Sequence, residues 1–293
     1  MTLEQNYVAD TLRIDPNLFR IRDLIYRASG IFQPDNKFYL LQSRCAKRQA
    51  ATGAATLADY CLLLSRDTEM RILLNEITVG ETTFFRNPAH IEAFRKSVIP
   101  QLVESKTRFG NRHLRVWSAG CATGEEPYTL AMLLAEEMRG LLKGWTYEIL
   151  AVDLNDHRLM QAREGIYGEY ALQNVSPYFL QKYFRQKDGR HQVCDEIRSV
   201  VNFDRLNILD DYRMVFLKGM DVVFCCNVLI YFGSESKRRV IQHFHNNVSL
   251  GGYLFLGHAE SLFGINNDFR LVHFPGCVAY RKHARKPSPT SVV

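Results

Sequence analysis

The sequence lacks several features that would place it in a special class of protein. No apolar run approaches the ~18 residues needed to span a bilayer, and the first residues have no basic-then-apolar pattern of a secretory signal. The seven cysteines include no C-x-x-C pair, which argues against a disulfide framework and against a zinc site. We therefore expect a cytoplasmic protein with reduced thiols and no bound metal, in which the adjacent Cys225 and Cys226 are small core residues.

Phosphate-binding glycine motifs are missing as well. The stretch "VWSAGCATGEEPYTLAMLLAEE", residues 116–137, predicts a buried strand, a turn with two glycines and a helix. Gly120 and Gly124 are four positions apart, so neither G-x-G-x-x-G nor a P-loop can be drawn through them. Glu125 and Glu126 follow at once, and they would repel a pyrophosphate. The turn therefore suits a ligand with cationic and hydroxyl groups.

The composition is that of an ordinary globular chain. Its 293 residues, 46% of them hydrophobic, are enough for one large core or two domains. The formal charge of +6 lies after residue 85, and it suits an acidic protein partner or nucleic acid, although a solvated surface is the commoner explanation. Arg44, Lys47 and Arg48 share one face of an expected helix, which could hold an acidic partner or be a solvated face.

The periodicity of apolar residues changes along the chain. Residues 16–75 predict short helices, with stops at Gly30 and Gly53. From residue 114, continuous apolar strands alternate with helices, which indicates a parallel sheet covered on both faces, and "FRLVHFPGCVAYRK" predicts a closing antiparallel strand. The pieces "KYFRQ", "HQVCD" and "SVVNFDR", within about 178–207, break this rhythm and predict a small antiparallel β insertion.

A ligand of such a sheet binds at the carboxyl ends of the strands, so the residues there are the candidates for function. Asp153 ends a predicted strand 33 positions after Gly120, where a carboxylate can bind both hydroxyls of a ribose. A helix cap is the other interpretation of this acid. His258 ends a later strand, and we expect it to be a structural histidine.

Together with "EITVGETTFFRNP", these segments resemble the CheR family of chemotaxis-receptor glutamate methyltransferases, which use S-adenosylmethionine. The resemblance runs from about residue 16 to 282, and its most specific pieces are "TFFR", "SAGCATGEEPY", "VDLN", "REGIY", "CNVLIYF" and "GHAES". It implies an α/β fold with a Rossmann-like S-adenosylmethionine-dependent methyltransferase domain, a mostly parallel sheet and an antiparallel final strand. The implied division is a helical domain over 1–80, a linker contributing to the active site over 81–100, the methyltransferase domain with its β insertion over 101–283, and a tail or linker over 284–293.

The resemblance also implies roles for individual residues. Cofactor contacts are implied for Gly80, Thr82, Arg86, Gly120, Glu126, Asp153, Asn207, Ile208, Cys226 and Asn227. Catalytic roles are implied for Arg86, as an orienting group, and for Tyr231, whose hydroxyl would lie near the transferred methyl. Tyr231 could instead line the core beside Phe232. The family usually has Asn in place of Gly80 and often a basic residue in place of Cys226.

The implied reaction is methyl transfer to glutamate side chains of a methyl-accepting chemoreceptor, which forms methyl esters for signalling adaptation and releases S-adenosylhomocysteine. A glutamate with a pKa of ~4.3 is already ionised at neutral pH, so its attack on a sulfonium methyl needs no general base. The expected partner is the receptor's cytoplasmic helical bundle, and the expected state is a monomer without nucleic acid or membrane insertion. Two alternatives stay open: a non-catalytic S-adenosylmethionine-binding or receptor-binding regulator, and a methyltransferase for another substrate. Nucleic-acid bases are disfavoured, because "CCNVLIYF" lacks the Asn/Asp-Pro-Pro-aromatic motif of base-amino methylation.

Overall fold

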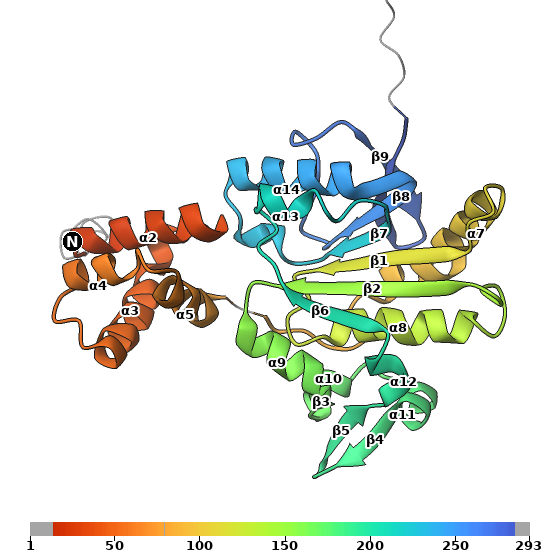
Figure 1. Ribbon diagram of the computed structural model, residues 1–293, viewed down its shortest axis with the longest axis horizontal. Helices are drawn as coiled ribbons and strands as arrows, with labels where there is room; N and C mark the ends of the chain where they lie inside the picture. The colour runs from red at the N-terminus through yellow and green to blue at the C-terminus, as the bar shows by residue number, and fades with distance from the viewer. Residues whose placement is uncertain (1–13, 79, 285–293) are drawn as a thin grey trace, which may run out of the picture. The chain divides into compact units, whose positions relative to one another are not determined.

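The computed structural model describes residues 14–78 and 80–284, which form two compact units. The first unit contains residues 14–78 with Tyr231–Gly233, and the second contains the rest (Figure 1). Within these residues, no helix has the length and apolar character needed to cross a membrane. Residues 1–13 of the predicted helical domain and nearly all of the predicted tail lie outside the described residues.

Helices make up the first unit. They are α2 (Pro16–Ser29), the 3-10 turn η1 (Asp35–Lys37), α3 (Phe38–Thr52), α4 (Leu57–Leu63) and α5 (Asp67–Ile77). Asp15 caps α2 by accepting the Asn17 amide at 2.8 Å. Gly30 and Gly53 follow α2 and α3 in the left-handed conformation, which ends a helix and favours glycine. Both predicted stops are therefore confirmed.

The basic side chains of α3 have partners inside this unit. Arg44 donates to the backbone carbonyl of Glu76 at 2.5 Å, and the Lys47 ammonium binds the Glu76 carboxylate at 2.8 Å. Arg48 binds both carboxylate oxygens of Glu69 at 2.9 Å, and these two side chains are only 15% and 11% exposed. The partners of these three basic side chains thus belong to α5, and the contacts hold α3 against α5.

A seven-stranded sheet in the order β6-β2-β1-β7-β8-β10-β9 forms the centre of the second unit. Its strands are β1 (His113–Ala119), β2 (Thr146–Asp153), β6 (Val201–Arg205), β7 (Met220–Cys225), β8 (Val248–Leu256), β9 (Phe269–Phe274) and β10 (Cys277–Lys282). The first five are parallel, whereas β10 pairs antiparallel with both β8 and β9, as the sequence predicts. The strand order reverses between β1 and β7, and such a switch point leaves a crevice at the carboxyl edge.

Helices cover both faces of this sheet. The described helices and helical turns that follow α5 along the chain are α6 (Pro88–Ala93), the π-helical turn η2 (Phe94–Val98), α7 (Ile99–Thr107), α8 (Glu125–Glu137), α9 (Asp156–Glu164), α10 (Glu169–Leu172), α11 (Pro177–Tyr183), α12 (Asp195–Arg198), α13 (Asp211–Met214), η3 (Leu229–Tyr231) and α14 (Ser234–Asn247). Alternate residues of β1 point to opposite faces. Trp117 packs edge-on against Phe244 of α14 at 5.1 Å, while Val116 belongs to the core cluster that contains Leu130 of α8. Figure 1 shows α14 and α8 on opposite sides of the sheet.

The helical run from α6 to α7 continues through residue 100, where the predicted linker ends. Pro100 is the second residue of α7, two positions after the end of the π-helical turn, and a proline without an amide hydrogen cannot bond to the preceding turn of an α-helix. The run therefore changes its hydrogen-bond pattern at this point without ending. The division at residues 80, 100 and 283 stays a prediction.

A second, three-stranded antiparallel sheet has the order β3-β5-β4. Its strands are β3 (Ile166–Tyr167), β4 (Phe184–Lys187) and β5 (Arg190–Val193). Asp188 and Gly189 join β4 to β5 with φ values of 47° and 73°, a two-residue turn that matches the twist of a hairpin. The prediction that "SVVNFDR" supplies a third strand of this sheet is wrong. Those residues form β6, because Val201 pairs with Ile149 and extends the main sheet beyond β2.

Candidate functional site

The glycine turn after β1 lies at the crevice. The amides of Gly120 and Cys121 both donate to the carbonyl of Val152, at 2.8 and 2.9 Å. A Cβ on Gly120, whose φ is 83°, would lie 2.4 Å from Cγ2 of Val228, so only glycine fits between β1 and the loop after β7. Gly124, with φ 95°, begins α8 under similar restraint. The turn is thus fixed against the ends of β2 and β7.

Asp153 fastens this turn at the end of β2. Its Oδ2 accepts the Ala122 amide at 2.9 Å, and its Oδ1 accepts the Asn155 amide at 2.8 Å. Each carboxylate oxygen can accept more than one hydrogen bond, so capacity for ligand hydroxyls is left. The N-cap of α9 is Asn155, which accepts the Arg158 amide at 3.1 Å. The helix-cap interpretation of Asp153 therefore does not apply.

Two further carboxyls begin α8 beside the turn. Oε1 of Glu126 accepts the Ser118 hydroxyl at 2.6 Å, and burial raises the pKa of Glu126 to about 7 although the thiol of Cys226 also donates to it. Burial likewise raises the pKa of Glu125 to about 7; this side chain is 4% exposed and accepts the Thr123 hydroxyl at 2.7 Å. A buried carboxylate without a full counter-charge favours a cationic ligand.

The loop after β7 carries Cys226 and Asn227. Glu260 pins it, because its Oε2 accepts the amides of Asn227 and Gly257 at 2.9 and 2.7 Å, and its Oε1 accepts that of Ile230 at 3.1 Å. Burial raises the pKa of Cys226 well above its usual value, so this residue is a neutral thiol. Glu260 lies in the quoted piece "GHAES", but its anchoring role had no signal in the sequence beyond that motif.

The segment from Gly80 to Arg86 borders the glycine turn after β1. Gly80 lies so close that a Cβ there would be 3.2 Å from Cβ of Ala122. Thr82 is half-buried, and the exposed Arg86 donates to the carbonyl of Glu81 at 2.8 Å. The positive charge of Arg86 offsets a small part of the rise that burial gives the pKa of Glu126.

Asn207 and Ile208 lie in the loop after β6, the strand next to β2. The amide of Leu206 donates to the carbonyl of Asp153 at 3.0 Å, and Oδ1 of Asn207 accepts the Leu209 amide at 3.0 Å. Ile208 is 6% exposed and offers an apolar wall. The structure thus brings together the predicted cofactor residues of the second unit at one edge of the sheet, at the end of β2, at the start of α8 and in the adjoining loops. Their individual roles stay predictions.

Tyr231 is placed differently. It ends η3, four positions after Asn227, and its carbonyl accepts the Phe32 amide of the first unit at 2.8 Å. Tyr231 follows the loop after β7 along the chain, but it belongs to the first, helical unit by its contacts. The catalytic role of Tyr231 therefore stays a prediction.

Backbone strain collects in these loops. Four described residues other than glycine have positive φ: Phe85 at 54°, Ala122 at 48°, Asn227 at 61°, and Asp188 in the hairpin turn. The first three lie in three of the loops at the predicted site: the segment from Gly80 to Arg86, the turn after β1 and the loop after β7. Such conformations are costly, and they persist mainly where the surrounding structure fixes them, often at functional sites.

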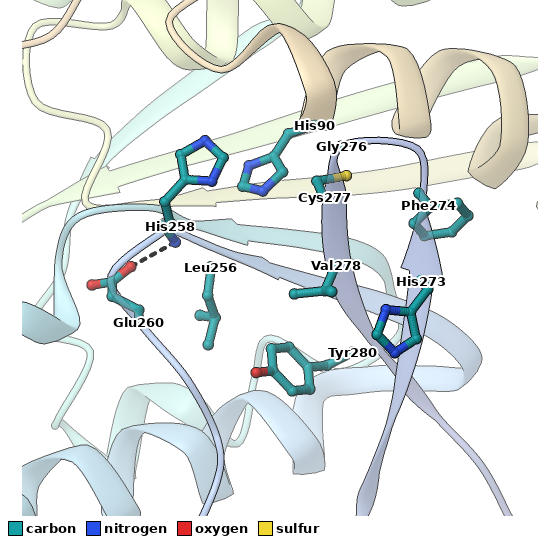
Figure 2. A pocket seen from close by; sticks show the side chains of 11 residues that line it. His90, Leu256, His258, Glu260, His273, Phe274, Gly276, Cys277, Val278 and Tyr280 are labelled. Carbon is teal, nitrogen blue, oxygen red and sulfur yellow. Dashed lines mark hydrogen bonds between the residues drawn. The ribbon is translucent and has the colours of Figure 1, made fainter.

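A cavity of about 370 Å³ lies beside Glu260 and the end of β8 (Figure 2). It is lined by residues of α6, of the loop after β8 and of the β9–β10 hairpin: His90, Leu256, Gly257, His258, Glu260, His273, Phe274, Gly276, Cys277, Val278 and Tyr280. The rings of His90 and His258 stack with centroids 5.2 Å apart, and Nδ1 of His90 lies 3.9 Å from Sγ of Cys226. Burial lowers the pKa of His90 to about 4, so it is neutral at pH 7. Within residues 14–78 and 80–284, no group of His, Cys, Asp and Glu is arranged to hold a metal ion.

The carboxylates decide which ligand fits this edge. Glu126 can accept an ammonium group and Asp153 can accept hydroxyls, while the glycine turn leaves the backbone accessible. S-adenosylmethionine carries an ammonium, a sulfonium and a ribose but no phosphate. Its chemistry therefore fits the residues present.

Comparison with known proteins agrees with this chemistry. Residues 16–78 match the CheR methyltransferase all-alpha domain, and residues 80–277 match the CheR methyltransferase SAM binding domain. The chain is 36% identical over 274 residues to chemotaxis protein methyltransferase 1 of Pseudomonas aeruginosa, across 91% of this chain and 97% of that protein. It is 33% identical over 254 residues to the chemotaxis protein methyltransferase of Borreliella burgdorferi, across 85% and 89% of the two chains. The predicted resemblance, fold class and cofactor are thereby confirmed, and the chain belongs to the CheR family of S-adenosylmethionine-binding chemotaxis methyltransferases.

Proposed function

We propose that this protein transfers the methyl group of S-adenosylmethionine to glutamate side chains of a chemoreceptor, forming glutamate methyl esters. The observation that carries the proposal is the pair Glu126 and Asp153 beside a glycine turn, in a chain related to proteins named chemotaxis methyltransferases. Two acids suit a cationic methyl donor. They would not suit a phosphate-containing cofactor.

The proposed cofactor contacts follow the carboxyl edge of the sheet. Glu126 binds the ammonium group, and Asp153 binds the ribose hydroxyls. Ile208 packs against the apolar part of the cofactor, and Gly120 lets it approach the backbone. The remaining contacts come from Gly80, Thr82, Arg86, Asn207, Cys226 and Asn227.

The chemistry demands positioning more than proton transfer. When bound, the cofactor supplies an electrophilic methyl group on a sulfonium. An acceptor glutamate is already ionised at pH 7, so the residues of the site need only hold its oxygen in line at about 3 Å, which can lower the barrier by several kcal/mol. Arg86 attracts a carboxylate most strongly before the reaction, because the negative charge of the acceptor is lost in the transition state. Its role is therefore to orient the reactants and not to stabilise the transition state. The Tyr231 hydroxyl completes the positioning of the reacting groups.

The small sheet β3-β5-β4 is the proposed docking element for the receptor. Arg185, Lys187 and Arg190 are exposed on its hairpin, so it presents positive charge and a short strand edge. A compact two-residue turn leaves little loop to enclose a peptide, so we propose contact with the receptor's helical bundle. Replacing Lys187 to His191 by a short Gly-Ser link should leave cofactor affinity unchanged and slow receptor methylation at least fivefold. Methylation at the wild-type rate would remove the sheet from docking.

Incubation with methyl-labelled S-adenosylmethionine and a receptor cytoplasmic fragment tests the reaction. We expect label that is released by mild base and that maps to glutamate residues by mass spectrometry. A fragment with those glutamates replaced by alanine is the control and should stay unlabelled. Tight cofactor binding without any transfer would favour a non-catalytic regulator, and base-stable label would indicate another acceptor.

A further inference from the structure

Gly80 faces a guanidinium group. A Cβ placed on Gly80 would lie 1.2 Å from Nη1 and 2.5 Å from Cζ of Arg158. The backbone of Gly80 is not in the left-handed region, so its conformation alone would accept any small residue. The guanidinium of Arg158 thus occupies the volume that a side chain at position 80 would need, so such a side chain would push it away.

Arg158 also acts electrostatically on the cofactor site. It projects from α9, and its positive charge lowers the pKa values of Asp153 and Glu125 against the larger, opposite effect of burial. The other titratable groups facing these acids are Cys121 in the turn and Tyr167 on β3. Burial raises the pKa values of both well above their usual range, so both are neutral at pH 7. Arg158 therefore supplies positive charge that favours the ionised forms of both Asp153 and Glu125.

We propose that Arg158 is a cofactor-positioning residue, whose guanidinium sits on Gly80 and holds the segment carrying Thr82 and Arg86 beside the Asp153 end of the S-adenosylmethionine site. A side chain at position 80 would displace the guanidinium of Arg158 from this place. The inference rests on the proposed cofactor contacts and is independent of the methyl acceptor.

A double-mutant cycle read out as S-adenosylhomocysteine affinity tests this coupling. Gly80→Ala and Arg158→Ala should each weaken binding at least fivefold. The double variant should be no weaker than Arg158→Ala, because no guanidinium is left to displace. Matched controls are Gly168→Ala, where a Cβ meets nothing within 4 Å, and Arg163→Ala, on the same helix but bound to the Phe203 carbonyl. Both controls should bind within twofold of wild type.

The pH profile separates positioning from a packing defect. Arg158→Gln, which keeps a polar side chain without the charge, should move the part of the affinity profile that the ionisation of Asp153 sets to higher pH, because Asp153 becomes harder to ionise. A defect in packing would weaken binding equally at every pH. Melting temperatures of all variants identify any that fail to fold.

Three results would overturn the inference. They are wild-type affinity in both single variants, losses that multiply in the double variant, and an unmoved pH profile in Arg158→Gln. If the proposed cofactor site itself were wrong, Asp153→Ala would also bind S-adenosylhomocysteine with normal affinity. Failure of the proposed acceptor would leave every binding result intact and appear only in the methylation assay.

Discussion

Glu126 is the side chain whose replacement best tests the cofactor site. Its Oε1 accepts the Ser118 hydroxyl at 2.6 Å, and burial raises its pKa to about 7. Glu126→Gln keeps the size and an oxygen for Ser118 but removes the charge that meets the ammonium group of the cofactor. The substitution thus isolates the charge.

The structure sets the expected size and sign of the effect. A hydrogen bond between charged partners contributes about 1.5–3 kcal/mol, so Glu126→Gln should weaken binding at pH 8 by at least about tenfold. The cofactor binds the ionised form of Glu126. With a pKa of about 7, roughly nine-tenths of this carboxyl is protonated at pH 6, so wild-type affinity should fall about tenfold from pH 8 to pH 6. The variant has no charge to lose here, and the two proteins should converge at pH 6.

Calorimetric titration with S-adenosylhomocysteine at pH 6, 7 and 8 measures this directly. Glu125→Gln is the matched control, because the pKa of Glu125 is also about 7 but its carboxyl is buried against Thr123. This control should keep the tenfold pH dependence. Binding by Glu126→Gln within twofold of wild type at pH 8, or with the wild-type slope, would refute the assignment.

Other residues give further predictions. Asp153→Ala should weaken S-adenosylmethionine binding at least tenfold, about 1.4 kcal/mol, because ribose and turn contacts are both lost; unchanged affinity by calorimetry would contradict this. In steady-state kinetics at saturating cofactor, Tyr231→Phe should lower turnover more than cofactor affinity, and Arg86→Ala should lower turnover; full turnover in both would remove them from the site. Glu125→Gln should raise the free energy of unfolding at pH 8 by up to about 3 kcal/mol, because Glu125, whose pKa is raised from 4.5 to about 7 in the folded chain, costs the wild type stability as pH rises between these two values. In denaturant titrations this gain should shrink towards pH 4.5, and a gain independent of pH would contradict the reasoning.

Local patterns were enough to predict much of the fold. Gly30 and Gly53 end helices because the left-handed cap conformation favours glycine at any such position. The end of β2 at Asp153 was visible because a continuous apolar strand stops at a polar residue. Strand ends of a parallel sheet meet at one edge, so the place of the site followed from the fold class.

Contacts between distant residues could not be predicted in this way. The strand β3 has two residues, too few for a periodic pattern, and β6 was assigned to the wrong sheet because the short strands on either side of α12 look alike. The approach of Arg158 to Gly80 and the binding of three amides by Glu260 depend on how distant parts of the chain come together. The spacing of residues in the sequence does not contain this information. The anchoring contacts in these loops were therefore missed, whereas the positions of Glu126 and Asp153 beside the glycine turn were predicted.

The most direct test of the central claim is a crystal structure of the chain with S-adenosylhomocysteine. The account predicts the ligand at the carboxyl edge of the parallel strands, with its ammonium group within hydrogen-bond distance of Glu126 and both ribose hydroxyls on Asp153. A ligand bound elsewhere, or one that leaves these two carboxylates without contact, would contradict it.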